Sequence, residues 1–233
     1  MVDGGAMRPG WWVGADRCLQ CHAPASSAGL CHACLTALPW NTPACWHCAE
    51  ALPDQTASRC PACLQRAPPW HGTWCALRFE APIVRWIHAL KYHADLSAAR
   101  RLALLLAHAL RQHRAPPPEL LVPMPLFPAR MRLRGFNQAQ LLADTLGHAL
   151  RLRAAPAAAR RLRDTADQTE LSAKERRRNL RGAFAADARQ VAGRHVAIVD
   201  DVLTTGASCH ALSLALRNAG AVRIDVWCVA RTP

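Results

Sequence analysis

Apolar and polar residues follow two different periods along most of this chain. From residue 73 onward, short apolar runs rich in β-branched residues alternate with longer stretches in which apolar residues recur every three or four positions. The first pattern is typical of strands and the second of amphipathic helices. We expect strands over 73–81, 119–122, 194–199 and 222–229, and helices over 83–92 and 96–113. Three further helices are expected: one capped by Asn137 after an arginine-rich turn, one after the Ser172-x-x-Glu175 capping box, and one that ends near Gly220.

This alternation predicts the fold class. Strands that alternate with helices form a mainly parallel sheet with right-handed crossovers. We therefore expect an α/β domain over residues 73–233, preceded by a small module over residues 1–67, with the boundary near Ala67-Pro68-Pro69. A chain of 233 residues has room for both.

Cysteine pairs dominate the first part of the chain. Eight of the 11 cysteines form four Cys-x-x-Cys pairs, and this spacing places two thiolates on one tetrahedral zinc ion. A duplicated arrangement favours sequential pairing into two structural zinc sites over a cross-braced one. We expect His22, His32 and His47 to lie on the surface, and Cys75, Cys209 and Cys228 to be buried as small apolar residues. The expected zinc ligands are Cys18, Cys21, Cys31, Cys34, Cys45, Cys48, Cys60 and Cys63.

An acidic pair follows the most apolar strand. Val196–Val199 is the kind of run that is buried on both faces of a parallel sheet, and Asp200 and Asp201 come directly after it. Ionised carboxylates accept hydrogen bonds from the 2′ and 3′ hydroxyls of a sugar. The small residues that follow offer hydroxyls, backbone N–H groups and a helix N-terminus to a phosphate. The expected phosphate-binding residues are Thr204, Thr205, Gly206, Ala207 and Ser208.

This segment resembles the 5-phosphoribosyl-1-pyrophosphate (PRPP) motif of the type I phosphoribosyltransferases. The resemblance implies PRPP, together with Mg²⁺, as ligand. Purine-salvage members place an aspartate after the two apolar residues, where this chain has Thr204. Purine salvage is therefore disfavoured, and we assign no catalytic residue and leave open whether a transferase reaction occurs.

A narrower resemblance extends over nearly the whole chain. After the four cysteine pairs come Leu90-Lys91-Tyr92, an Arg134-Gly135-Phe136-Asn137-Gln138 run and a Thr165-x-x-Gln168-x-x-Leu171-Ser172 run, all ahead of the aspartate motif. This order resembles the ComF/GntX family. Membership implies a role in bacterial competence or DNA utilisation, in which incoming single-stranded DNA is handled.

The same resemblance suggests pyrophosphate and lid positions. Backbone at Pro123, Met124 and Pro125 would meet the pyrophosphate, with Lys91, Arg130 and Arg134 as cationic partners. Residues 164–181 would form a lid that includes Thr165, Gln168 and Arg178.

Charge and hydropathy complete the expectations. The net charge of +13 favours an anionic partner. The sequence offers neither a leader peptide nor an apolar run long enough to cross a bilayer, so we expect a cytoplasmic protein without membrane insertion. The alternative function is a zinc-ribbon adaptor that binds other proteins and carries a vestigial phosphoribosyltransferase domain.

Overall fold

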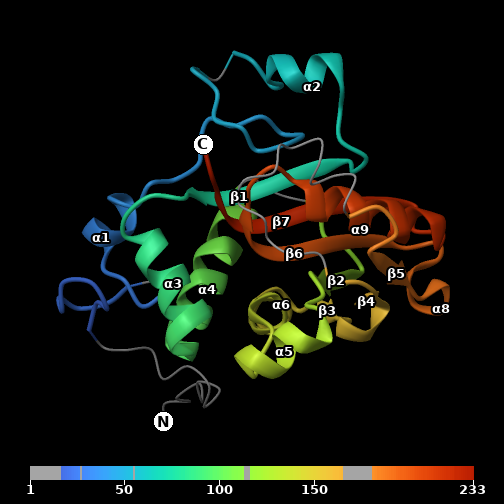
Figure 1. Ribbon diagram of the computed structural model, residues 1–233. Helices are drawn as coiled ribbons and strands as arrows, with labels where there is room; N and C mark the ends of the chain where they lie inside the picture. Colours follow the sequence, from blue (N-terminus) through green and yellow to red (C-terminus); the bar gives the residue numbers. More distant parts are fainter. Residues whose placement is uncertain (1–16, 27, 55, 113–115, 165–179) are drawn as a thin grey trace, which may run out of the picture. The chain divides into compact units, whose positions relative to one another are not determined.

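The structure is a computed structural model that describes residues 17–26, 28–54, 56–112, 116–164 and 180–233. The chain divides into two compact units, Met1–Leu38 and Pro39–Pro233. The second unit contains the second group of cysteine pairs together with the whole sheet (Figure 1). The boundary that composition suggests near Ala67 stays a prediction.

The described part of the first unit is organised around its cysteines. The helix α1, His32–Thr36, begins at Cys31, whose Sγ atom accepts a hydrogen bond from the backbone N–H of Cys34 at 3.4 Å. Cys18 and Leu30 are fully buried. These contacts replace the larger apolar core that so short a segment lacks.

A five-stranded sheet forms the centre of the second unit. Its order is β1-β7-β6-β2-β3, and every neighbouring pair is parallel. The central strand β6 carries Val196–Val199, all of which are fully buried, as expected for a strand covered on both faces. The expected mainly parallel α/β fold is thus confirmed. The strands are β1 Gly72–Arg78, β2 Leu120–Pro123, β3 Arg153–Ala154, β6 His195–Leu203 and β7 Arg223–Arg231.

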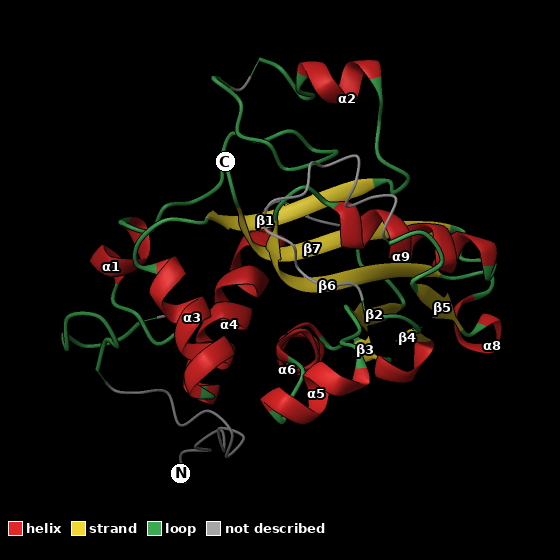
Figure 2. Cartoon of the chain, viewed as in Figure 1, coloured by secondary structure: helices red, strands yellow, loops and turns green. Residues whose placement is uncertain are grey.

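Helices cover both faces of this sheet (Figure 2). Val196 and Ile198 share a core cluster with Leu212 and Leu216 of α9, whereas α4 and α6 pack against each other and against other strand positions. Since side chains alternate along a strand, successive residues of β6 face different helices. The remaining helices of the described residues are α2 Pro61–Gln65, α3 Ile83–His93, α4 Leu96–Gln112, α5 Pro128–Arg134, α6 Gln138–Leu150, η1 Pro156–Ala158, α8 Ala188–Val191 and α9 Ala207–Asn218.

Three local features differ from the sequence expectations. The arginine-rich segment before Asn137 is the helix α5, which begins with Pro128 at a position where proline is well tolerated. The strand β6 extends through both aspartates to Leu203, because it continues to pair with β7. A separate antiparallel pair, β4 (Ala159–Arg161) with β5 (Phe184–Ala186), was not expected from the sequence.

The chain ahead of β1 continues the hydrogen bonding of this strand. Asn41 donates its backbone N–H to the carbonyl of Ala76 at 3.0 Å, and Arg78 donates to the carbonyl of Pro39 at 2.8 Å. Further along, Thr73 donates to the carbonyl of Trp46 at 2.8 Å. Residues 39–46 are therefore fixed to the sheet by backbone bonds.

Every helix among the described residues is too short or too polar to cross a lipid bilayer.

Candidate functional site

The eight paired cysteines form two groups that follow the order of the chain. Within each group the four sulfur atoms lie within 4.8 Å of one another. This spacing fits a tetrahedral tetrathiolate site, so the residues present suit structural zinc. The sequential pairing is confirmed. The first group is Cys18, Cys21, Cys31 and Cys34, and the second is Cys45, Cys48, Cys60 and Cys63.

Within the first group, backbone donors favour the thiolate form of Cys18. Burial alone would raise the pKa of Cys18, but hydrogen bonds from backbone N–H groups of Cys31, Gln20 and Cys21 lower it to about 6. A thiol that loses its proton this readily is a good zinc ligand.

Trp70 connects the second cysteine group to the sheet. Its indole Nε1 donates to the carbonyl of His47 at 2.8 Å and to Oγ1 of Thr73 at 2.7 Å. His47 was expected on the surface but is 8% exposed, and its Nε2 lies 2.7 Å from the carbonyl oxygen of Trp70. The expectation for His47 was wrong because this reciprocal contact draws its ring inward. Trp70 also underlies the loop after β6, since a Cβ atom at Gly206 would lie 3.2 Å from its indole ring.

The acidic pair lies near the carboxyl end of β6. Asp201 is 3% exposed and faces α3 and α6, while Asp200 is half-buried and pairs in register with Cys228 of β7. The carboxyl ends of parallel strands are where α/β sheets bind ligands. The two carboxylates therefore lie at the edge where sheets of this type commonly bind ligands, but in different surroundings.

An ion pair fixes the charge of Asp201. The Nζ atom of Lys91 lies 2.5 Å from Oδ2 of Asp201. Burial tends to raise the pKa of Asp201, but the Lys91 ammonium outweighs it and holds this pKa below its ordinary value. Burial likewise tends to lower the pKa of Lys91, and the Asp201 carboxylate raises it instead. Both groups are thus charged at neutral pH.

Asp200 has the opposite tendency. Its burial and the neighbouring Asp201 carboxylate raise the pKa of Asp200 well above its ordinary value. Cys75, Cys209 and Cys228 are buried, as expected, and the Cys228 side chain, together with burial and the nearby Asp200, raises the pKa of Cys209. Asp200 is consequently the member of the pair that gains most from a ligand able to donate hydrogen bonds to it.

A chain of polar contacts joins the Arg-Gly-Phe-Asn-Gln segment to the acidic pair. Arg134 donates to Oε1 of Gln138 at 2.6 Å, and Nε2 of Gln138 lies 3.5 Å from Oδ1 of Asp201. Asn137 accepts from the N–H of Ala139 at 3.0 Å, so it caps α6 as expected. Its amide also donates to the carbonyl of Met124 at 3.0 Å. These bonds hold the end of β2 and the start of α6 beside Asp201.

The loop after β6 leads directly into the N-terminus of α9. Thr204 and Thr205 are exposed, and Gly206 has a φ of +71°, a conformation that favours glycine. Gly206 is also the N-cap residue of α9, a helix of 12 residues. Such an N-terminus attracts a phosphate.

The structure brings together most, but not all, of the expected site residues. Pro123, Met124 and Pro125 are buried at the end of β2, whereas Arg130 forms an ion pair with Asp164 at 3.6 Å. Thr165, Gln168 and Arg178 lie outside the described residues. Sequence reasoning missed two contributors: Gln138, although it belongs to a quoted motif, and Trp70, for which the sequence carries no signal.

The sheet is mainly parallel and carries an acidic pair and a glycine-containing loop at one edge, and the chain also has two tetracysteine groups. These features define a phosphoribosyltransferase-like protein with zinc-ribbon-like sites. The chain is 35% identical to "Competence protein F" of Haemophilus influenzae over 223 residues, covering 92% of this chain and 96% of that protein. It is 36% identical over 222 residues, with the same coverage, to "DNA utilization protein YhgH" of Escherichia coli. The chain belongs to the ComF/GntX family.

Other comparisons add little to this assignment. No family model matches the chain. A purine phosphoribosyltransferase from Pyrococcus horikoshii shares 19% sequence identity and a TM-score of 0.36, covering 58% of this chain and 74% of that one. At this level the similarity adds nothing to the sheet topology described above.

Proposed function

We propose that the carboxyl end of the sheet binds PRPP or a related ribose phosphate. The observation that carries this proposal is the position of Asp200 and Asp201, which end a buried strand beside the loop that starts α9. Asp200 and Asp201 accept the two ribose hydroxyls, and residues 204–208 hold the 5′-phosphate. The carboxylates also suit Mg²⁺, which would neutralise the pyrophosphate when bound.

Cationic residues near the pair supply the pyrophosphate subsite. Arg134 reaches the acidic pair through Gln138, and Lys91 contacts it directly. Arg130 is drawn toward Asp164, at the beginning of the segment expected to act as a lid. A pyrophosphate placed between these cations competes with Gln138 and Asp164 for them. Ligand binding therefore rearranges contacts that the free protein already makes.

Calorimetry with PRPP and Mg²⁺ tests the proposal. The double variant Asp200→Asn/Asp201→Asn should weaken binding at least about tenfold, because charged hydrogen bonds each contribute about 1.5–3 kcal/mol. A matched control, Asp54→Asn/Glu80→Gln, removes two exposed acids and should bind like the parent. Equal affinities for the parent and the Asp200/Asp201 variant would rule out this site.

We propose, second, that the protein handles single-stranded DNA. The names of the similar proteins, which refer to competence and DNA utilisation, support this function, as does the net charge of +13. Each phosphate contact adds about −0.7 to the slope of log affinity against log salt for single strands. Replacing Arg176, Arg177 and Arg178, which lie outside the described residues, with alanine should flatten this slope by about 2 if all three contact phosphates. An unchanged slope in a fluorescence-anisotropy salt series would remove these arginines from the DNA surface.

A further inference from the structure

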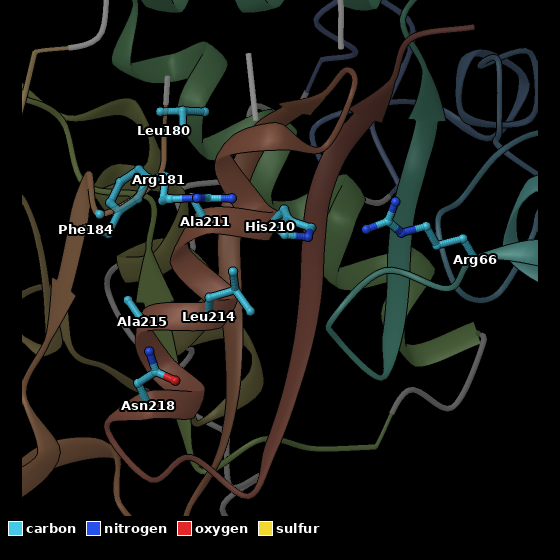
Figure 3. Close-up of a pocket in the computed structure, with 10 residues that line it drawn as sticks. Arg66, Leu180, Arg181, Phe184, His210, Ala211, Leu214, Ala215 and Asn218 are labelled. Atoms are coloured by element: carbon cyan, nitrogen blue, oxygen red, sulfur yellow. The ribbon is translucent and has the colours of Figure 1, made fainter. Parts of the chain in front are cut away.

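A cavity of about 560 Å³ lies along α9, from His210 in the first turn of this helix to Asn218 at its end (Figure 3). Its volume falls within the range of small-molecule sites. The described residues that line it do not include Thr204–Ser208. The cavity is therefore a second concave surface, distinct from the site at the end of β6.

The apolar part of the cavity comes from two elements. Ala211, Leu214 and Ala215 of α9 form one side, and Leu180 and Phe184, from the turn and strand ahead of α8, form the other. Positions three and four apart lie on one helical face, so these α9 residues are neighbours. The opposite face of α9 packs into the core. The small side chains of Ala211 and Ala215 leave a shallow surface on which a flat ring can lie.

Positive charge gathers at one end of the cavity. Arg66 and Arg181 both line it, and Figure 3 shows their side chains extending toward the end at which His210 lies. No acidic side chain is among the described residues that line the cavity. Arginine is well suited to bind a phosphate through paired N–H groups. This end of the cavity therefore favours an anionic group.

An amide marks the other end. Asn218 lies eight residues beyond His210 on α9, about 12 Å along a helix axis. An asparagine amide offers both a donor and an acceptor, which is the pattern that recognises the edge of a base such as adenine. Along the cavity, the Asn218 amide comes first, then the apolar wall and then the cationic end. These match, in the same order, the edge of a base, its face and a phosphate.

We propose that this cavity binds a nucleotide, with the base against Leu214 and Phe184 and the phosphate beside Arg66 and Arg181. The same chemistry is presented by a free nucleotide and by one nucleotide of a single strand. The inference is independent of the proposed PRPP site, because it uses none of that site's residues.

The test uses the full chain and 2′-deoxyadenosine 5′-monophosphate (dAMP) as the probe in calorimetry. Ala215→Trp fills the cavity, and Arg66→Ala/Arg181→Ala removes the cations without touching the core; each should weaken dAMP binding about tenfold or more. Deoxyadenosine lacks the phosphate, so it should bind to the parent about tenfold more weakly than dAMP does. The double arginine variant should bind deoxyadenosine and dAMP with equal affinity. Matched controls are Ala188→Trp and Arg85→Ala/Arg189→Ala, at exposed positions.

Two further measurements separate the alternatives. The Asp200→Asn/Asp201→Asn variant should retain dAMP binding; loss there, with retention in the cavity variants, would place the nucleotide in the ribose-phosphate site and overturn the inference. A ten-residue deoxyadenosine oligonucleotide distinguishes the source of the ligand. Weaker oligonucleotide binding by the cavity variants indicates a strand nucleotide, and unchanged oligonucleotide binding with weaker dAMP binding indicates a free one. If the cavity variants bind both probes like the parent, or if the parent binds neither, the cavity is not a nucleotide site.

Discussion

Lys91 and Asp201 form an ion pair of 2.5 Å that joins the last turn of α3 to the carboxyl end of β6. The pair gives the two neighbouring aspartates different properties. Asp201 keeps its charge because the Lys91 ammonium compensates it. The pKa of Asp200 is raised instead, because it is buried and lies beside the charged Asp201 carboxylate. A site built in this way holds one fixed acceptor and one whose protonation responds to ligand and pH.

Replacing Lys91 with methionine should destabilise the fold. The variant leaves the buried Asp201 carboxylate without its cation, which typically costs about 3 kcal/mol or more. Chemical denaturation measures the loss. Because the pKa of Asp201 is lowered, this group stabilises the folded protein at pH values above its ordinary pKa of 3.8. Because the pKa of Lys91 is raised, this group stabilises the folded protein at pH values below its ordinary pKa of 10.5. The stabilisation that the ion pair gives the parent should therefore be fully present between these pH values and be lost outside them. A variant as stable as the parent at pH 7 would contradict the ion pair.

Replacing Asp200 with asparagine should stabilise the protein at neutral pH. The raised pKa of Asp200 means that the folded state prefers the protonated acid, so the parent loses stability as pH rises from about 3.8 through the folded-state pKa. The neutral amide avoids this loss. Thermal unfolding at a series of pH values should show the variant gaining on the parent as pH rises. Asp201→Asn is the matched control and should have the opposite effect at pH 7, since it removes the partner of Lys91.

Zinc content should be about two per chain, because two groups of four thiolates fill two tetrahedral sites. Elemental analysis of reduced protein that has not met a chelator measures it. Cys18→Ser and Cys60→Ser should each leave about one zinc ion, and their combination almost none. A value near zero in the parent would show that the cysteine groups are held together without metal.

Replacing Trp70 with phenylalanine should lower the free energy of unfolding by about 1–3 kcal/mol. An aromatic ring is retained, but the five-membered ring of the indole is lost together with the Nε1 donor that serves both His47 and Thr73. Urea denaturation checks the effect. Trp46→Phe is the control, because Trp46 is 42% exposed and its backbone carbonyl, which accepts from Thr73, is unchanged. Equal effects of the two substitutions would mean that the Trp70 indole donor contributes nothing.

Replacing Gly206 with alanine should weaken PRPP binding and destabilise the fold. Its φ of +71° costs an alanine about 1–2 kcal/mol, and the added methyl group meets the Trp70 ring at 3.2 Å. Gly193→Ala separates the two effects, since Gly193 has the same φ of +71° and open space around it. A larger loss of stability at Gly206 than at Gly193 isolates the contact with Trp70. If the two losses of stability are equal, the Trp70 ring moves to accommodate the methyl group without destabilising the fold.

The α/β fold could be predicted because its signals are local. The apolar run Val196–Val199 and the cap at Asn137 each specify their element without distant contacts. The end of β6 could not be predicted in this way. Polar Asp200 and Asp201 end the apolar run, yet the strand continues because β7 supplies hydrogen-bonding partners as far as Arg231. The helix α5 was missed for a related reason: its arginines and exposed Leu133 give no amphipathic pattern.

The candidate site was predictable in its residue types and not in its pairings. Lys91 and Arg134 were placed on the pyrophosphate from motif order alone. Their contacts with Asp201 and Gln138 depend on how α3 and α6 approach β6, which no local pattern encodes. Trp70 gives a stronger example, since its partners His47 and Gly206 lie 23 residues before it and far after it in the chain.

The backbone bonds between residues 39–46 and β1 have a consequence for self-association. β1 is the last strand of the sheet, and an uncovered outer strand presents free N–H and C=O groups that pair readily with another molecule. Pro39, Asn41 and Trp46 occupy part of that row. A chain shortened to begin at residue 73 would expose it, and we expect such a fragment to aggregate through edge-to-edge strand pairing even when its core is intact. Residues 39–46, which lead into the second cysteine group, thus cover an edge along which two sheets would otherwise pair.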